Sequence, residues 1–359
     1  MIFSLLALAG LWAGPTTIGP FDPSVRILGR FDSTSAGAVL SWPGTGAQIA
    51  FEGKSCQVRI GSTGAVVGVV VDGLAAADLK LVAPANDTLV SVAANLKPGR
   101  HVVELVKKTE PMVGVATLKG FVVDGKGSTL PQPATRRIEF VGNSITCGYG
   151  VLDSVKEHHF SAETEDFTAT FAALSAKALG ADLQVVAYSG KGLLRNYEGD
   201  NGPVVPALYS QSIYSETPKP WHFARWTPDV VVIDLGTNDF SRAPLPDSSA
   251  WESAWMAFLE TIRKARGNVP VVLVNGPMLS DYWPNDANGK PLPSLTKVRR
   301  HLRNVAAQAK AKGFASVTVL DLAPNSPERG YGADWHPNRA QQALNGQELT
   351  AHLKKTLGW

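Results

Sequence analysis

The segment Arg137-Ile-Glu-Phe-Val-Gly-Asn-Ser-Ile-Thr-Cys-Gly-Tyr-Gly150 decides the fold of the C-terminal half of the chain. Its apolar residues around Phe140 predict a short buried strand, which stops abruptly before Ser144. Open α/β folds place their chemistry at the carboxyl ends of strands, so Ser144 is a candidate functional hydroxyl. The residues after it can begin a helix, whose first N–H groups favour an oxyanion. The alternative is that Ser144 only caps that helix.

Downstream of this segment, apolar strands alternate with helical patterns up to the C-terminus. The expected strands are Ile138–Val141, Leu183–Tyr188, Val230–Leu235, Val271–Val274 and Val317–Leu320, and the expected helices are Phe167–Leu179, Trp251–Ala265, Leu295–Ala311 and Arg339–Leu357. Nearly continuous Val, Ile and Leu strands that alternate with helices indicate a parallel sheet covered on both faces. The stretch 195–226 fits neither period and is expected to be an elaborated loop with one short helix.

Upstream, residues 20–125 have a different character: short β-rich segments separated by Gly and Pro. The expected strands are Val25–Phe31, Val39–Trp42, Gln48–Phe51, Gln57–Ile60, Val66–Val71, Thr88–Ala93, His101–Lys107 and Thr117–Val123. This pattern predicts an antiparallel β-sandwich of the jelly-roll type, with the clearest tight turn at Asp72-Gly73. The stretch 126–135, rich in Gly, Pro and Ser, is the expected linker to an α/β domain over 136–359.

Size and composition agree with two globular domains. The chain has 359 residues, of which 44% are hydrophobic and 18% charged, and 359 residues are too many for one ordinary core. Its formal net charge is only +3, without a basic run, which argues against a nucleic-acid partner. The two cysteines, Cys56 and Cys147, fall in different expected domains; a single bridge between them is not the default, and Cys147 is interpreted as a small buried hydrophobe.

The first 14 residues contain an apolar run from Ile2 to Trp12 that is too short to span a bilayer. It resembles the apolar region of an export signal, although no Lys or Arg precedes it. The alternative is a buried N-terminal helix. The expectation is a secreted or periplasmic protein with no membrane span in its mature form.

Four segments near strand ends or in late loops carry polar residues that could take part in catalysis. They are Gly142-Asn143-Ser144, Ser189-Gly190-Lys191-Gly192, Gly236-Thr237-Asn238-Asp239 and Gly332-Ala333-Asp334-Trp335-His336-Pro337-Asn338. Each has a plain structural alternative, because Gly, Asn and Asp are turn residues and Asp is a helix cap. Their joint occurrence at the strand ends of one α/β domain favours a functional interpretation.

These residues complement one another chemically. A Ser144 hydroxyl needs a base, and His336 suits that role near neutral pH. In an extended segment residues i and i+2 point the same way, so the Asp334 carboxylate is expected to contact His336. An oxyanion needs donors, which the N–H groups of Ser144 and Gly190 and the amide of Asn238 can supply.

With these residues in view, the C-terminal domain resembles the SGNH branch of the GDSL esterase/lipase family. Ser144, Gly190, Asn238 and His336 match its four sequence blocks, and the resemblance implies a flavodoxin-like three-layer fold. The β-rich region and the sequence Asp-Trp-His-Pro more narrowly resemble carbohydrate esterase family 2. Asn143 replaces the usual Asp before the nucleophile, and the Asp-x-His spacing leaves open whether Asp334 or a backbone carbonyl orients His336.

The resemblance implies a serine esterase that removes O-acetyl groups from polysaccharides such as xylan or glucomannan, with a leaning toward O-6 acetyl groups. Flat aromatic groups suit sugar rings, so Trp335, and less strongly Trp221 and Trp226, are candidate substrate-binding residues. No metal or other cofactor is expected, and the oligomeric state is left open. Two rival functions are a lipid esterase or thioesterase of the same fold and a non-catalytic carbohydrate-binding protein.

Overall fold

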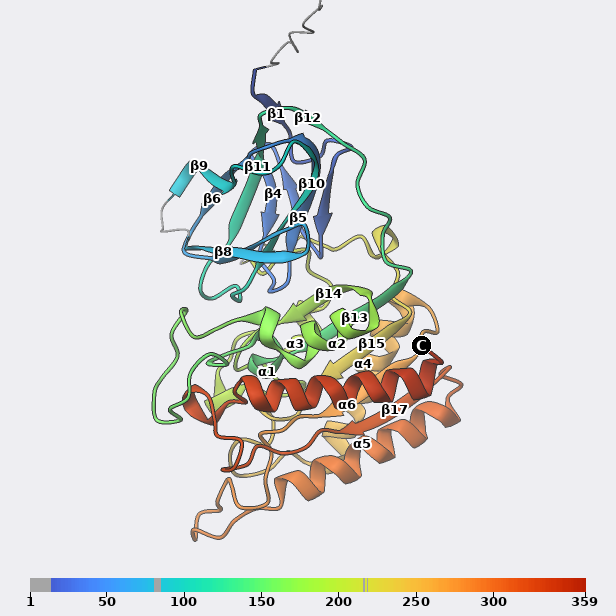
Figure 1. Ribbon diagram of the computed structural model, residues 1–359. Coiled ribbons are helices and arrows are strands. Elements are labelled where there is room, and N and C mark those ends of the chain that lie inside the picture. Colours follow the sequence, from blue (N-terminus) through green and yellow to red (C-terminus); the bar gives the residue numbers. More distant parts are fainter. Residues whose placement is uncertain (1–13, 81–84, 216, 218) are drawn as a thin grey trace, which may run out of the picture.

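The computed structural model describes residues 14–80, 85–215, 217 and 219–359. Except for Gly14, the expected export signal lies outside this part of the chain. Figure 1 shows a β-sandwich stacked on a domain in which helices cover a parallel sheet. Among the helices described, none has the length and apolar character needed to span a membrane.

The N-terminal region contains two antiparallel sheets. One has the strand order β3-β4-β11-β6-β9 with β1 beside β11, and the other has the order β12-β5-β10-β7-β8 with β2 beside β5. Their bounds are β1 Thr16–Ile18, β2 Val25–Leu28, β3 Asp32–Thr34, β4 Gly37–Leu40, β5 Gly46–Gly53, β6 Cys56–Ser62, β7 Val66–Val71, β8 Leu74–Lys80, β9 Ala85–Ala93, β10 Gly99–Lys107, β11 Ala116–Val123 and β12 Lys126–Gly127. Apolar side chains from both sheets, such as Ile49 and Phe121, form the core.

The sequence anticipated most of this region. All eight expected segments overlap strands, although Val25–Phe31 and Val39–Trp42 extend beyond the ends of β2 and β4, whereas β1, β3, β8 and β12 were not anticipated. The predicted turn at Asp72-Gly73 is confirmed: its residues have φ of 50° and 83°, and Val71 lies opposite Leu74. Positive φ at both positions is what a two-residue hairpin requires. Strand β12 uses the first two residues of the expected linker and pairs with β5.

The C-terminal region contains a parallel sheet in the order β14-β13-β15-β16-β17. Strand order 2-1-3-4-5 is that of the flavodoxin-like fold, so the predicted parallel α/β domain is confirmed. Helices α2 and α6 pack on one face of the sheet, and α4 and α5 pack on the other. The bounds are β13 Arg136–Gly142, α1 Ser144–Cys147, α2 Phe171–Leu179, β14 Ala181–Ala187, α3 Val205–Leu208, β15 Val230–Asp234, α4 Ser248–Arg266, β16 Val271–Asn275, α5 Ser294–Ala311, β17 Val317–Asp321 and α6 Arg339–Leu357.

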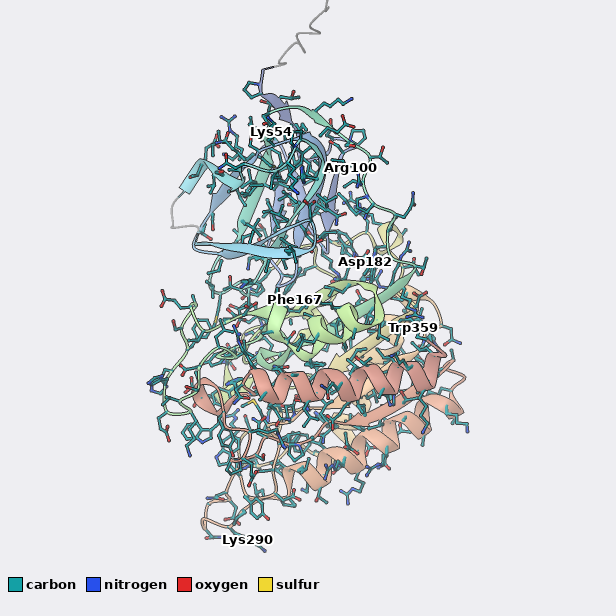
Figure 2. All side chains as sticks on the ribbon, in the orientation of Figure 1. Lys54, Arg100, Phe167, Asp182, Lys290 and Trp359 are labelled. Atoms are coloured by element: carbon teal, nitrogen blue, oxygen red, sulfur yellow. The ribbon has the colours of Figure 1, made fainter. Side chains whose placement is uncertain are left out.

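The two regions share a buried interface. Its apolar part joins Trp42 of the sandwich to Val186 and Leu208 of the α/β domain. Nearby, the backbone N–H of Phe167 donates to Lys108 O at 2.9 Å, and Phe167 lies at the junction of the two domains in Figure 2. The interface is therefore packed like a core rather than joined only by a linker.

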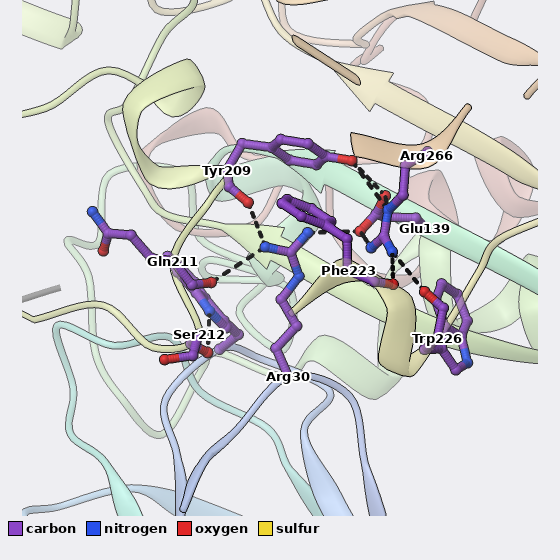
Figure 3. A network of polar contacts seen from close by, with 9 residues as sticks. Arg30, Glu139, Tyr209, Gln211, Ser212, Phe223, Trp226 and Arg266 are labelled. Carbon is purple, nitrogen blue, oxygen red and sulfur yellow. Dashed lines mark hydrogen bonds and ion pairs between the residues drawn. The ribbon is translucent and has the colours of Figure 1, made fainter. Parts of the chain in front are cut away.

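A buried ionic network crosses the same interface (Figure 3). Arg30 of the sandwich reaches Glu139 on β13 at 2.7 Å, and Arg266 at the end of α4 also pairs with Glu139. Tyr209 donates its hydroxyl to the same carboxylate at 2.8 Å. Because a buried charge without partners is costly, this carboxylate depends on a side chain from each region.

Candidate active site

Ser144 lies where β13 meets the single-turn helix α1. The N-cap of α1 is Asn143, whose side-chain oxygen accepts the N–H of Ile145 at 3.0 Å. Asn143 also donates its amide to Asp234 O at 3.2 Å, which ties this turn to the neighbouring strand β15. Because Asn143 does the capping, the hydroxyl of Ser144 remains free for another partner.

That partner is His336, 192 positions later in the chain. The hydroxyl of Ser144 lies 2.9 Å from His336 Nε2. On the other side of the ring, Nδ1 lies 3.1 Å from both Ala333 O and Asp334 O. Since carbonyl oxygens only accept, they place the proton on Nδ1 and leave Nε2 to accept from Ser144.

The His336 segment fits closely against the loop after α1. Gly150 has φ +59°, and a side chain there would meet Ala333 at 2.7 Å. The N–H of Ala333 donates to Gly150 O at 3.3 Å, and the N–H of Gly332 donates to His336 O at 2.8 Å. A glycine at position 150 therefore allows the two segments to approach closely enough for Ser144 and His336 to meet.

The expectation that the Asp334 carboxylate contacts His336 is wrong. Its oxygens instead bind the Tyr149 hydroxyl at 2.5 Å and His159 Nδ1 at 2.9 Å. The argument assumed an extended segment, but Asp334 and Trp335 have φ of 48° and 58°, so side chains two positions apart diverge. Of the two alternatives left open, backbone carbonyls orient His336.

Burial sets the proton affinity of His336. It lowers the pKa of His336 to about 4, although the hydrogen bonds to the Ala333 and Asp334 carbonyls and the negative charge of Asp334 act to raise it. The imidazole is therefore neutral at pH 7, which is the form that can accept a proton from a hydroxyl. The ring of Tyr149 stacks on this imidazole with centroids 4.0 Å apart.

Gly190 and Asn238 follow the two strands that flank β13 in the sheet. Gly190, after β14, has φ +76°, and its carbonyl accepts the N–H of Tyr197 at 2.8 Å. Asn238, after β15, donates its amide to Lys191 O at 2.8 Å and so ties the two loops together. Topology thus brings both residues to the sheet edge that carries Ser144.

The three candidate tryptophans lie in different environments. Trp335, next to His336, is 50% exposed. Trp221 is 5% exposed and packs against Phe31 of the sandwich, whereas the indole of Trp226 donates to Asp182 at the start of β14. The expectation for Trp221 and Trp226 is therefore wrong: one is buried in the domain interface, and the other lies at the amino end of the sheet.

Sequence reasoning missed two residues near the site. Tyr149 stands in the quoted segment, but its spacing gives no sign that it stacks on a histidine. Glu110, from the sandwich, accepts the N–H of Ser189 at 2.7 Å, beside Gly190. Glu110 also forms, with Cys147 and Glu165, a buried group of potential metal ligands within 4.8 Å of one another. The Lys107 ammonium donates to Glu110 O at 3.2 Å and so already supplies positive charge to this cluster.

Comparison with known proteins fits this geometry. Residues 140–344 match the GDSL-like Lipase/Acylhydrolase family, and residues 27–133 match the Carbohydrate esterase 2 N-terminal family. A solved family two carbohydrate esterase from Clostridium thermocellum, in complex with cellohexaose, is 32% identical with a TM-score of 0.86; the alignment covers 93% of this chain and 99% of that one. The chain belongs to carbohydrate esterase family 2. It is accordingly an enzyme of the carboxylic ester hydrolase class.

Two curated relatives of this family 2 esterase add to the picture. The cellulase/esterase CelE of Acetivibrio thermocellus is 32% identical over 94% of this chain, but the chain spans only 40% of that protein's length. An acetylxylan esterase / glucomannan deacetylase of Cellvibrio japonicus is 25% identical, over 100% of this chain and 99% of the relative.

Proposed function

We propose that this chain is a serine acetylesterase that removes O-acetyl groups from plant-wall polysaccharides such as xylan and glucomannan. The observation that carries the proposal is the 2.9 Å contact between the Ser144 hydroxyl and Nε2 of His336. The name of the Cellvibrio japonicus relative, an acetylxylan esterase / glucomannan deacetylase, supports this substrate class.

In the proposed first step, Ser144 Oγ attacks the acetyl carbonyl while His336 Nε2 accepts its proton. The N–H groups of Ser144 and Gly190 and the amide of Asn238 stabilise the oxyanion. His336 then protonates the sugar oxygen, which leaves with the polymer. In the second step water loses a proton to His336 and releases acetate from Ser144.

The side chains around His336 suit this proton traffic. As the imidazole becomes positive, its Nδ1–H donates to Ala333 O and Asp334 O. The stacked ring of Tyr149 lies against the same cation, and the charge of Asp334 is nearby. A cation over an aromatic face is stabilised, so these groups favour the intermediate imidazolium.

Exposed aromatic side chains support a saccharide substrate. Tyr197 follows β14, Trp283 follows β16 and Trp335 precedes α6, and their exposed fractions are 43%, 51% and 50%. Sugar rings bind to such flat apolar surfaces, and polar neighbours fix their hydroxyls. The solved relative in complex with cellohexaose is consistent with a glycan ligand. Within this proposal the preferred acetyl position is O-6.

The test is acetate release from acetylated xylan and acetylated glucomannan, and from a set of mono-acetylated sugars. Ser144→Ala should abolish release, and the O-6 acetyl sugars should react fastest. Hydrolysis of aryl esters of increasing acyl-chain length tests the alternative functions. A preference for long chains would support a lipid esterase or thioesterase, and polymer binding without acetate release would support a carbohydrate-binding protein.

We also propose that the sandwich is a jelly roll and that the enzyme works outside the cytoplasm. The strand orders β4-β11-β6-β9 and β5-β10-β7-β8 are those expected of a jelly roll. The apolar run from Ile2 to Trp12 supports export, since a polymer substrate lies outside the cell. Expression of the full chain in an exporting host, followed by determination of the mature N-terminus, tests export directly.

A further inference from the structure

A carboxylate from the sandwich reaches the loop that carries Gly190. Glu110, between β10 and β11, is fully buried. Its Oε2 accepts the N–H of Ser189 at 2.7 Å, and its Oε1 accepts the Ser189 hydroxyl in a short contact. Both oxygens thus bind a single residue 79 positions away, in the other domain.

We propose that Glu110 is a positioning residue for the oxyanion site, which it fixes by holding Ser189 across the domain interface. Ser189 and Gly190 share one peptide group, and that group contains the Gly190 N–H. The carbonyl of Gly190 is held from the other side by the N–H of Tyr197. With Ser189 clamped by Glu110 and Gly190 clamped by Tyr197, the Gly190 N–H keeps one direction. This inference rests on the proposed esterase function.

Glu110 is held in place by its own neighbours. Its N–H donates to Glu165 Oε1 at 3.3 Å, and its carbonyl accepts from the Lys107 ammonium at 3.2 Å. The carbonyl also accepts the N–H of Val113 at 3.2 Å, which closes the loop on itself. The carboxylate therefore projects from a loop that is held by several hydrogen bonds, so its two hydrogen bonds to Ser189 can fix the position of Ser189.

Glu110 shares its buried site with a second carboxylate, that of Glu165. Burial raises the pKa of Glu165 well above its ordinary value, and the neighbouring Glu110 raises it further. Two carboxylates whose oxygens lie within 4.8 Å of each other disfavour each other's ionisation. Burial also raises the pKa of Glu110, and the hydrogen bonds from the Ser189 hydroxyl and N–H oppose that rise, so the contact with Ser189 favours the ionised form of Glu110. An ionised carboxylate accepts stronger hydrogen bonds than a neutral one.

The test compares Glu110→Gln, Ser189→Ala and the double variant with the wild type, using an aryl acetate. A glutamine offers one acceptor in place of two, so Glu110→Gln should reduce kcat about 10-fold or more while KM changes by less than about threefold. Ser189→Ala should lower kcat less. Because both act on one contact, the double variant should be no worse than Glu110→Gln.

Arg30→Lys is the matched control, since it disturbs another polar contact of the same interface. It should lower the melting temperature and leave kcat unchanged at 25 °C. The proposal is overturned if Glu110→Gln keeps the wild-type kcat, or if the two losses multiply in the double variant. Ser144→Ala distinguishes failure of the proposed esterase mechanism from failure of the proposed role of Glu110. If Ser144→Ala stays active, the esterase mechanism is wrong, independently of the result for Glu110→Gln.

Discussion

The phenol ring of Tyr149 stacks on the imidazole of His336, with ring centroids 4.0 Å apart and planes at 24°. The same tyrosine donates its hydroxyl to Asp334 at 2.5 Å. The Asp334 carboxylate therefore acts on the histidine only indirectly, through its hydrogen bond with Tyr149 and through its charge. The backbone carbonyls of Ala333 and Asp334 hold the imidazole ring itself. Tyr149 fixes the plane of the imidazole and covers one of its faces.

Substitutions at Tyr149 should separate stacking from hydrogen bonding. Tyr149→Phe keeps the ring and loses only the contact with Asp334, so kcat on an aryl acetate should fall less than about 10-fold. Tyr149→Ala frees the imidazole, and misplacement of a reacting group by about 1 Å can cost about 10²-fold. Equal losses in the two variants would show that the hydroxyl, rather than the ring, is what matters.

Asp334→Asn tests the orientation of His336 by backbone carbonyls. In a triad whose carboxylate holds the histidine, the Asp-to-Asn change costs about 10⁴-fold in kcat. Here Nδ1 donates to Ala333 O and Asp334 O, which survive the substitution. We expect a loss of less than about 10²-fold, measured beside His336→Ala as the inactive reference. A loss of kcat near that of His336→Ala would mean that the Asp334 carboxylate, rather than the backbone carbonyls, orients the imidazole during turnover.

The pH profile should reflect the environment of His336. The neutral imidazole is the base, and burial lowers its pKa from 6.5 to about 4. The acid limb of kcat/KM should therefore lie below pH 5, with activity lost as the pH falls through the folded-state pKa. The folded pKa is below the unfolded one, so the contribution of His336 to stability is present above pH 6.5 and is lost as the pH falls toward 4. An acid limb centred near pH 6.5 would contradict this assignment.

Sequence reasoning recovered what depends on local pattern. Strand and helix periods gave the parallel sheet, and helix Arg339–Leu357 agrees with the expected bounds. The Ser144 segment could be assigned because strand ends of one sheet converge on one edge, and the His336 segment because it offers the base that a serine hydroxyl needs. The prediction failed where the backbone conformation has no sequence signature. Nothing in Asp334-Trp335-His336 indicates that two of these non-glycine residues have positive φ.

The contacts across the domain interface could not be predicted from the sequence either. Glu110 and Arg30 are charged residues in a β-rich region, where a solvated position is the usual expectation. Their partners Ser189 and Glu139 lie 79 and 109 positions away. Trp221 was misassigned for the same reason, since its burial depends on Phe31 of the other domain.

Arg30 should matter for stability rather than for catalysis. Burial alone would raise the pKa of Glu139, but Arg30 and Arg266 hold it below its ordinary value, so this carboxylate is ionised inside the protein. Loss of one partner of a buried ion pair typically costs about 3–5 kcal/mol. Arg30→Ala should lower the free energy of unfolding by about this amount, at the lower end because Arg266 and Tyr209 remain.

Urea unfolding, followed by circular dichroism and by residual esterase activity, measures this effect. The matched control is Arg300→Ala on the exposed surface, which should change the free energy of unfolding by less than about 0.5 kcal/mol. Since Arg30 joins the sandwich to the sheet of the α/β domain, both signals should shift together in one transition. Two separate transitions in the wild type would show that the domains unfold independently and that the Arg30–Glu139 contact does not couple them.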